Sequence, residues 1–143
     1  MKLGGLAVVI GLLTGWPLSA AAAQDADLGP VADLARDAFR EHRFKRLLEG
    51  GESVRLRLPG SPAGAPVRWE VAVAALESFT RRFDEIELTV LGAAIVEEGL
   101  GYIELRRRFR VRGMGDDTHE THRILLSVRK TGEGWQVVEV WVV

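Results

Sequence analysis

From residue 86 to the C-terminus, apolar and polar side chains alternate, and this pattern limits the possible folds more than any other feature. The alternation covers four segments, residues 86–90, 103–111, 124–128 and 135–143. A period of two is typical of β-strands that bury one face. Glycine-containing turns at residues 98–101, 113–116 and 131–134 are short enough for hairpins. The sequence therefore predicts an antiparallel meander of four strands.

The residues before the meander show helical spacing instead. Apolar positions predict a helix from Pro30 to about residue 42, a short second helix over 44–48, and a third over 67–83. Residues 54–58 alternate and predict a first strand, a candidate for the sheet edge. Residues 59–66 are rich in glycine, proline and alanine and predict an irregular loop. Together with the meander, these elements predict an α+β fold with helices packed on a sheet.

The first 23 residues have the three parts of a secretory signal. Lys2 gives a basic start, residues 6–13 are apolar, and residues 18–23 are small enough for a signal peptidase. The apolar stretch is shorter than the roughly 20 residues that span a bilayer. We therefore expect cleavage near Ala23, one domain over residues 24–143, and a secreted or periplasmic protein with no membrane association after cleavage. An uncleaved anchor is the alternative.

Composition excludes several classes of site. The chain has no cysteine, so it has no disulfide, no thiolate nucleophile, no cysteine-ligated metal and no lipid-modified cysteine. Its formal net charge is −1, which offers no overall field for nucleic acid. No phosphate-binding loop or dinucleotide fingerprint is present. We expect no nucleic-acid partner and no cofactor.

Polar side chains are expected on the apolar face of the meander. Centring the middle hairpin on residues 115–116 places Arg107 opposite Ile124 and Phe109 opposite His122. Both Arg107 and His122 then point inward. A buried charge is costly unless it is paired, so an inward arginine needs a partner or a ligand.

The last hairpin has two possible parities. Centring its turn on residues 132–133 places Glu139 opposite Leu126 and Trp141 opposite Ile124, on the inward face. The other parity stays open because the alternate positions are apolar too. An outward apolar patch would favour a homodimer through the sheet, and its members would be Val138, Val140 and Val142.

These inward side chains predict a ligand site formed by Arg107, Phe109, His122, Glu139 and Trp141. Arg107 would bind an anionic group, while His122 or Glu139 would exchange a proton or orient the ligand. Glu120 is a possible fourth polar member. The alternative is an internal arginine–glutamate pair that only satisfies itself.

Other charged residues of the meander favour no site of their own. On a strand, His119 and His122 face opposite sides, so no metal site is expected. The outward arginines should be partly offset, because Glu87 is expected opposite Arg112 and Glu104 shares their face, while Thr89 is expected opposite Arg110. These arginines are Arg106, Arg108, Arg110 and Arg112.

The order of elements, the passage from helix to strand over residues 44–58, and the terminal Gly134-Trp135 strand resemble the nuclear transport factor 2-like (NTF2-like) superfamily. This superfamily includes ketosteroid isomerase-like and SnoaL-like proteins. The resemblance implies a cystatin-like cone in which a curved sheet wraps around N-terminal helices. It also implies an open end that holds a small apolar ligand, and dimers formed through the sheet.

The resemblance does not extend to a known catalytic signature. Ketosteroid isomerase-like members use an inward aspartate base and a tyrosine, whereas Tyr102 here has the outward parity. We therefore expect a non-catalytic domain that binds a small apolar or anionic ligand, or a protein. One alternative is an isomerase or lyase that uses His122 or Glu139 as base with Arg107. Another is a structural subunit of an exported complex that docks through its sheet.

Overall fold

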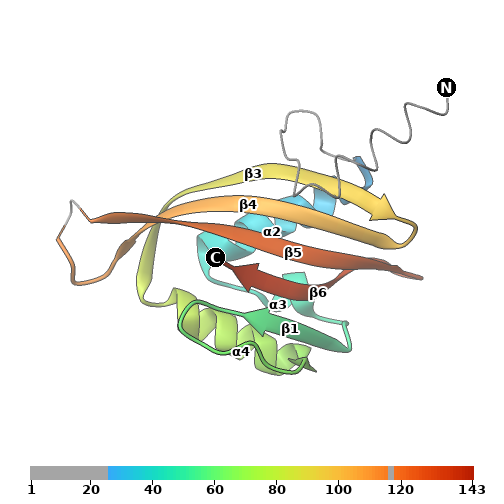
Figure 1. The fold of residues 1–143 in the computed structure, drawn as a ribbon, viewed down its shortest axis with the longest axis horizontal. Helices are drawn as coiled ribbons and strands as arrows, with labels where there is room; N and C mark the ends of the chain where they lie inside the picture. Colours follow the sequence, from blue (N-terminus) through green and yellow to red (C-terminus); the bar gives the residue numbers. More distant parts are fainter. Residues whose placement is uncertain (1–25, 116–117) are drawn as a thin grey trace.

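The computed structural model of the protein describes residues 26–115 and 118–143 (Figure 1). The expected signal at residues 1–23 lies outside them. Among the described residues, no helix has the length and apolar character needed to cross a membrane. The helical elements are η2 (Ala26–Leu28), α2 (Gly29–Glu41), α3 (Lys45–Leu48) and α4 (Trp69–Thr80). The strands are β1 (Ser53–Arg57), β2 (Val67–Arg68), β3 (Phe83–Glu97), β4 (Leu100–Val111), β5 (His119–Thr131) and β6 (Gly134–Val142).

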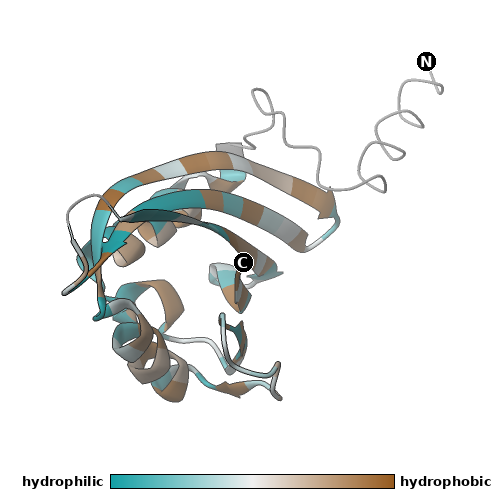
Figure 2. Cartoon of the chain, turned by 60° about the vertical axis from the view of Figure 1, so that its left-hand side comes forward, coloured by the Kyte–Doolittle hydropathy of each residue, from teal (hydrophilic) through white to brown (hydrophobic). Residues whose placement is uncertain are grey.

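The strands form one sheet in the order β2-β1-β6-β5-β4-β3. Strands β3 to β6 pair antiparallel in sequence order, which confirms the predicted meander. Strand β1 pairs parallel with β6, and the two-residue β2 covers its other side, so β1 is next to the edge and not at it. Figure 2 shows the sheet curving around the helices, and alternating hydropathy along its strands. The predicted α+β class is confirmed.

Local sequence explains where the helices begin and end. Pro30 stands in the first turn of α2, where its missing N–H costs nothing, and His42 ends the helix in the left-handed conformation at φ 56°. Residues 67–68, which were predicted to begin the third helix, form strand β2 instead. Val71, one of the apolar positions whose spacing predicted this helix, is 52% exposed, while the neighbouring Ala72 is buried.

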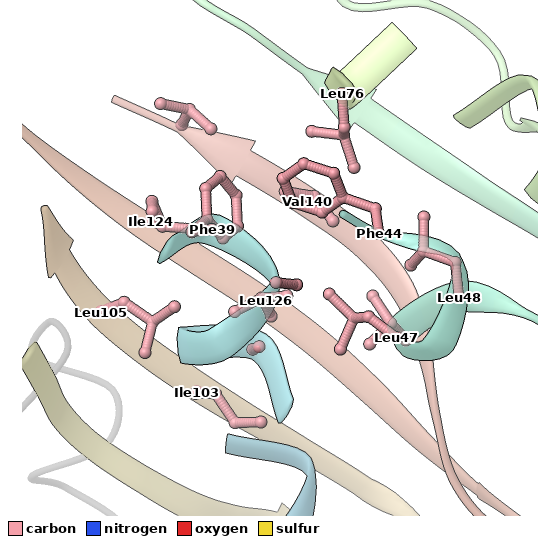
Figure 3. Packing of buried hydrophobic residues seen from close by; sticks show 14 of the residues in the cluster. Phe39, Phe44, Leu47, Leu48, Leu76, Ile103, Leu105, Ile124, Leu126 and Val140 are labelled. Carbon is pink, nitrogen blue, oxygen red and sulfur yellow. The ribbon is translucent and has the colours of Figure 1, made fainter. Parts of the chain in front are cut away.

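The inside of the curve is filled with side chains (Figure 3). Phe39 of α2 and Phe44 before α3 are completely buried and meet edge to face, with ring centroids 4.9 Å apart. They pack with aliphatic side chains of the sheet, including Leu105, Ile124 and Val140. Apolar burial of this extent is the main driving force for folding.

The middle hairpin differs from prediction by two residues. Leu105 lies opposite Ile124, Arg107 opposite His122, and Phe109 opposite Glu120. The predicted partners, Ile124 for Arg107 and His122 for Phe109, are therefore wrong. Because side chains alternate with a period of two, a shift of this size leaves every residue on its predicted face, and alternation alone cannot detect it.

A bulge in the last hairpin reverses the direction of the side chains in the C-terminal part of β6. The register shifts at Ser127/Val128, so Glu139 lies opposite Ser127 and Trp141 opposite Leu125, on the outward face. Val140 and Val142 point inward and are buried. The inward placement of Glu139 and Trp141 is wrong, and so is the outward patch of these two valines. An extra residue on one strand reverses the parity beyond it.

A second bulge acts on β3, between Glu85 and Glu87. It leaves Ile86 39% exposed and turns the Glu85 side chain inward. It also helps to shift the pairing of β3 with β4, so that Glu87 faces Arg108 and Thr89 faces Arg106. The predicted partners, Arg112 and Arg110, are wrong.

The β3–β4 turn depends on a glycine with a positive φ. Gly99 has φ +77°, whereas Gly132 in the β5–β6 turn does not lie in the left-handed range, and an added Cβ would meet nothing at either site. We expect Gly99→Ala to lower the free energy of unfolding by about 1 kcal/mol, because only the backbone is strained. Gly132→Ala should leave it unchanged or raise it slightly. Urea unfolding of both variants checks this, and equal losses would contradict it.

Candidate functional site

The inward polar face of the sheet centres on one ion pair. Arg107 of β4 is completely buried, and the Glu85 side chain of β3 is 6% exposed. Arg107 Nε donates to Glu85 Oε1 at 2.9 Å, and Nη2 donates to Glu85 Oε2. In this bidentate arrangement, the planar guanidinium faces the planar carboxylate. Each charge neutralises the other inside the protein.

Two histidines flank the pair. His42, at the end of α2, donates through Nε2 to Glu85 Oε2 at 2.9 Å. Arg107 Nη1 lies 3.5 Å from Nδ1 of His122 on β5. Because arginine can only donate, His122 Nδ1 accepts and its proton is on Nε2. We call His42, Glu85, Arg107 and His122 the buried quartet.

Phenylalanine rings surround the buried quartet. The Arg107 guanidinium carbon lies 4.4 Å from the ring centroid of Phe109 and 4.9 Å from that of Phe83. Phe79 and Phe39 are farther, at 5.9 and 6.0 Å. The His122 ring is 4.5 Å from Phe109. Aromatic faces stabilise a desolvated cation, so the rings add to the charge pairing.

The surroundings shift two pKa values of the quartet. Burial raises the pKa of Glu85, but hydrogen bonds from His42 and Arg107 and their charges outweigh it and hold that pKa below its ordinary value. Burial, together with the Arg107 charge, lowers the pKa of His122 to about 4, against an opposing effect of Glu85. At neutral pH, Glu85 is ionised and His122 is uncharged.

The lowered pKa of His122 predicts a pH-dependent stability. Unfolded imidazole binds a proton near pH 6.5, while the folded ring stays neutral to about pH 4, so its contribution is complete above pH 6.5 and lost toward pH 4. We expect the free energy of unfolding to fall by about 1–2 kcal/mol from pH 7 to pH 5, since the half-buried ring keeps some screening. Glu85, with its lowered pKa, loses its contribution only at more acidic pH.

Urea titrations at several pH values measure the slope of the free energy of unfolding against pH. His122→Gln should flatten it, and His119→Gln, an exposed position on the same strand, should not. A slope that His122→Gln leaves unchanged would contradict the prediction.

The structure brings together part of the predicted site. Arg107, Phe109 and His122 share the inward face, and the inward direction of Arg107 is confirmed. Glu120 is the second residue of β5 and is exposed. Glu139 and Trp141 lie on the other face of the sheet, where both contact Arg57. The Arg57 guanidinium is 3.9 Å from Glu139 Oε2 and 4.0 Å from the Trp141 ring centroid.

Two members of the buried quartet were not predicted. In a regular strand, Glu85 and Glu87 would point to the same face of the sheet, and it is the bulge between them that makes their side chains point in opposite directions. His42 ends α2 in a left-handed conformation, which few non-glycine residues adopt and which helical spacing does not reveal. The one signal for Glu85 was general: an inward arginine needs a partner or a ligand, and a carboxylate is one such partner.

The outward face of the sheet holds a second buried carboxylate. Glu104 of β4 is 1% exposed and accepts from the Arg123 guanidinium. Its Oε1 is buried without a hydrogen-bond partner in the described part of the chain. Arg112 pairs with Asp84 at 2.9 Å. Within residues 26–115 and 118–143, no three histidine, aspartate or glutamate side chains gather as metal ligands.

No protein-family model and no curated protein matches the sequence. Solved structures are similar in fold. A ketosteroid isomerase-like protein from Erwinia carotovora atroseptica is 16% identical, with a TM-score of 0.62 over 79% of this chain and 90% of the other. A DUF4783 family protein from Bacteroides uniformis is 13% identical, with a TM-score of 0.60 over 76% and 91%. A protein of the NTF2-like family from Streptomyces avermitilis is 12% identical, with a TM-score of 0.58 over 81% and 92%.

Proposed function

Because this chain has the NTF2-like fold, we propose that it is an exported, non-catalytic domain that binds a small ligand. The fold occurs in both enzymes and binding proteins, so the function must be inferred from the residues of the site. One observation supports a non-catalytic role above others. Arg107, the residue best suited to bind an anion in the cone, is completely buried and holds both carboxylate oxygens of Glu85.

The pairing leaves Arg107 unavailable to an incoming anion. A ligand carboxylate would have to displace Glu85, and Glu85 would then be a buried charge without its cation. Leaving a carboxylate buried and unpaired costs several kcal/mol of free energy, which would cancel the gain from a good contact between the ligand and Arg107. The rings of Phe109 and Phe83 lie beside the pair, with centroids 4.4 and 4.9 Å from the Arg107 guanidinium carbon. The buried quartet therefore supports the fold, and ligand binding is expected elsewhere on the molecule.

Export is part of the proposal and has its own test. We expect the full chain, expressed in a Gram-negative host, to be recovered from the periplasm without residues 1–23 and beginning at Gln24. Intact mass and N-terminal sequencing of the periplasmic fraction measure this. Recovery of uncleaved protein in the membrane fraction would support the anchor instead.

Native mass spectrometry of residues 24–143, purified from the protein's own host, tests the binding role. A retained small molecule that is released on unfolding would support a ligand-binding domain. A ligand-free protein that carries a second, different chain would favour the structural-subunit alternative. The same spectrum gives the mass of any homodimer. A ligand-free protein with no partner would contradict the proposal.

One observation favours an isomerase or lyase as a second candidate. His122 is a neutral, half-buried imidazole, and among the described residues nothing accepts a hydrogen bond from its Nε2, which could therefore donate to a carbonyl oxygen. In an apolar site, such a donor stabilises the enolate that forms when a base from the buffer removes the α-proton of a ketone. The role as base expected from sequence fits less well, because Nδ1 faces Arg107 and the pKa is low.

Exchange of the α-protons of cyclohexanone for deuterium, followed by NMR, tests this second candidate. Enzymatic activity predicts exchange above the buffer rate that falls at least 100-fold in His122→Phe, since a single such donor contributes about that factor. His119→Phe is the matched control. Exchange at the buffer rate would exclude this chemistry for simple ketones.

A further inference from the structure

A groove runs along α2 on a part of the surface that the buried quartet does not reach. It consists of a depression of about 710 Å³ and a neighbouring one of about 370 Å³. Both are lined by Pro30, Leu34 and Arg46, so they are continuous. We call this depression the α2 groove; its floor is Pro30, Leu34 and Ala38, and its basic wall is Arg43, Lys45 and Arg46. Each of the two depressions has a volume in the range of small-molecule sites.

The floor of the α2 groove is an apolar strip. Pro30, Leu34 and Ala38 follow one another at intervals of four residues, which places them along one line of the helix. Eight residues of helix extend about 12 Å. Beyond Pro30, the second depression continues the strip to Leu47 and Trp135. A long apolar chain would therefore find a continuous surface.

The basic wall carries positive charge that the protein does not neutralise. Within the described residues, the exposed side chains of Arg43, Lys45 and Arg46 form no ion pair and no side-chain hydrogen bond. Glu41 is the one unpaired carboxylate beside them in the larger depression. The cations are thus in excess near the α2–α3 corner.

The acidic side chains elsewhere in the groove do not cancel this excess. Asp33 lies 3.3 Å from Arg36, and Asp37 lies 3.4 Å from both Arg36 and Arg40, so these two carboxylates are already paired. Asp27 and Glu49 line the smaller depression. Their charge disfavours an anion at that end and is compatible with an uncharged tail.

We propose that the α2 groove binds a small amphipathic carboxylate. The carboxylate lies between Arg43, Lys45 and Arg46, and the apolar chain lies over Leu34 and Pro30 toward Trp135. Unpaired guanidinium groups are the strongest partners for a carboxylate, and burial of methylene groups on the strip adds to the affinity. This inference rests on the proposed ligand-binding function and names its site and ligand class.

Calorimetric titration of residues 24–143 with dodecanoate, below its micelle concentration, tests the proposal. We expect saturable binding of one molecule per chain, at least tenfold weaker in the double variant Arg43→Glu/Arg46→Glu. Arg129→Glu is the matched control, because Arg129 is an exposed arginine on β5 outside the groove. Dodecanol, which has the same chain without the charge, should also bind at least tenfold more weakly. Leu34→Gln should weaken the binding of dodecanoate by a smaller factor than the double variant does.

The alternative outcomes are distinct. Dodecanoate binding that the charge variants leave unchanged, and that the cone variant Ile103→Ala weakens, would overturn the groove while the binding function stands. Binding of a deca-glutamate peptide without binding of dodecanoate would assign the basic wall to an acidic protein segment. No saturable binding of either probe would overturn the proposal, and native mass spectrometry would then decide the proposed function separately.

Discussion

Replacing Arg107 by alanine is expected to lower the free energy of unfolding by about 3–5 kcal/mol. The change leaves Glu85 as a buried carboxylate without its cation and opens space among the phenyl rings. It also removes the donor to His122 Nδ1. Urea unfolding at pH 7 measures the loss, and the effect should be among the largest for any single substitution in the chain.

Two further variants separate charge pairing from packing. Arg108→Ala, at the next and exposed position of β4, should change stability by less than about 0.5 kcal/mol. The double variant Glu85→Leu/Arg107→Met should recover most of the loss, because an apolar pair of similar volume removes both buried charges. If Arg107→Ala were no more harmful than Arg108→Ala, the buried quartet would not be a structural centre, and Arg107 would again be available to a ligand.

Replacing Phe44 by alanine is expected to cost about 3–5 kcal/mol as well. Phe44 is completely buried, its ring meets Phe39 edge to face at 4.9 Å, and its backbone N–H donates to Glu77 of α4. The substitution removes the ring and leaves a cavity where the turn before α3 packs inside the sheet. Thermal and urea unfolding of the variant measure this cost.

Val71→Ala on α4 is the matched control for the core prediction. Val71 is 52% exposed, so its truncation should change the free energy of unfolding by less than about 0.5 kcal/mol. A loss below about 1 kcal/mol for Phe44→Ala would mean that the cone interior rearranges easily. The interior would then have room for a ligand beside the buried quartet, contrary to the filled core described above.

Hydrophobic spacing alone was enough to predict the main helices and strands, their order and the faces of the middle strands. Hydrophobic periodicity depends only on side-chain spacing, so it located α2, α4 and the meander without any knowledge of contacts. It also placed Arg107 and His122 on the inward face, because a period of two is insensitive to a two-residue shift in pairing. Burial energetics then required either a partner or a ligand for Arg107, but charge alone did not identify Glu85 as that partner.

The choice of Glu85 as the partner of Arg107 depends on two bulges in the folded sheet. The bulge at Glu85/Glu87 turns Glu85 inward, and the bulge at Ser127/Val128 turns Glu139 outward. A bulge adds one residue to one strand and reverses the direction of every side chain beyond it, yet it leaves little trace in an alternating sequence when both faces carry apolar residues. The identity of the ion pair was therefore set by strand pairing across the sheet, which local periodicity does not record.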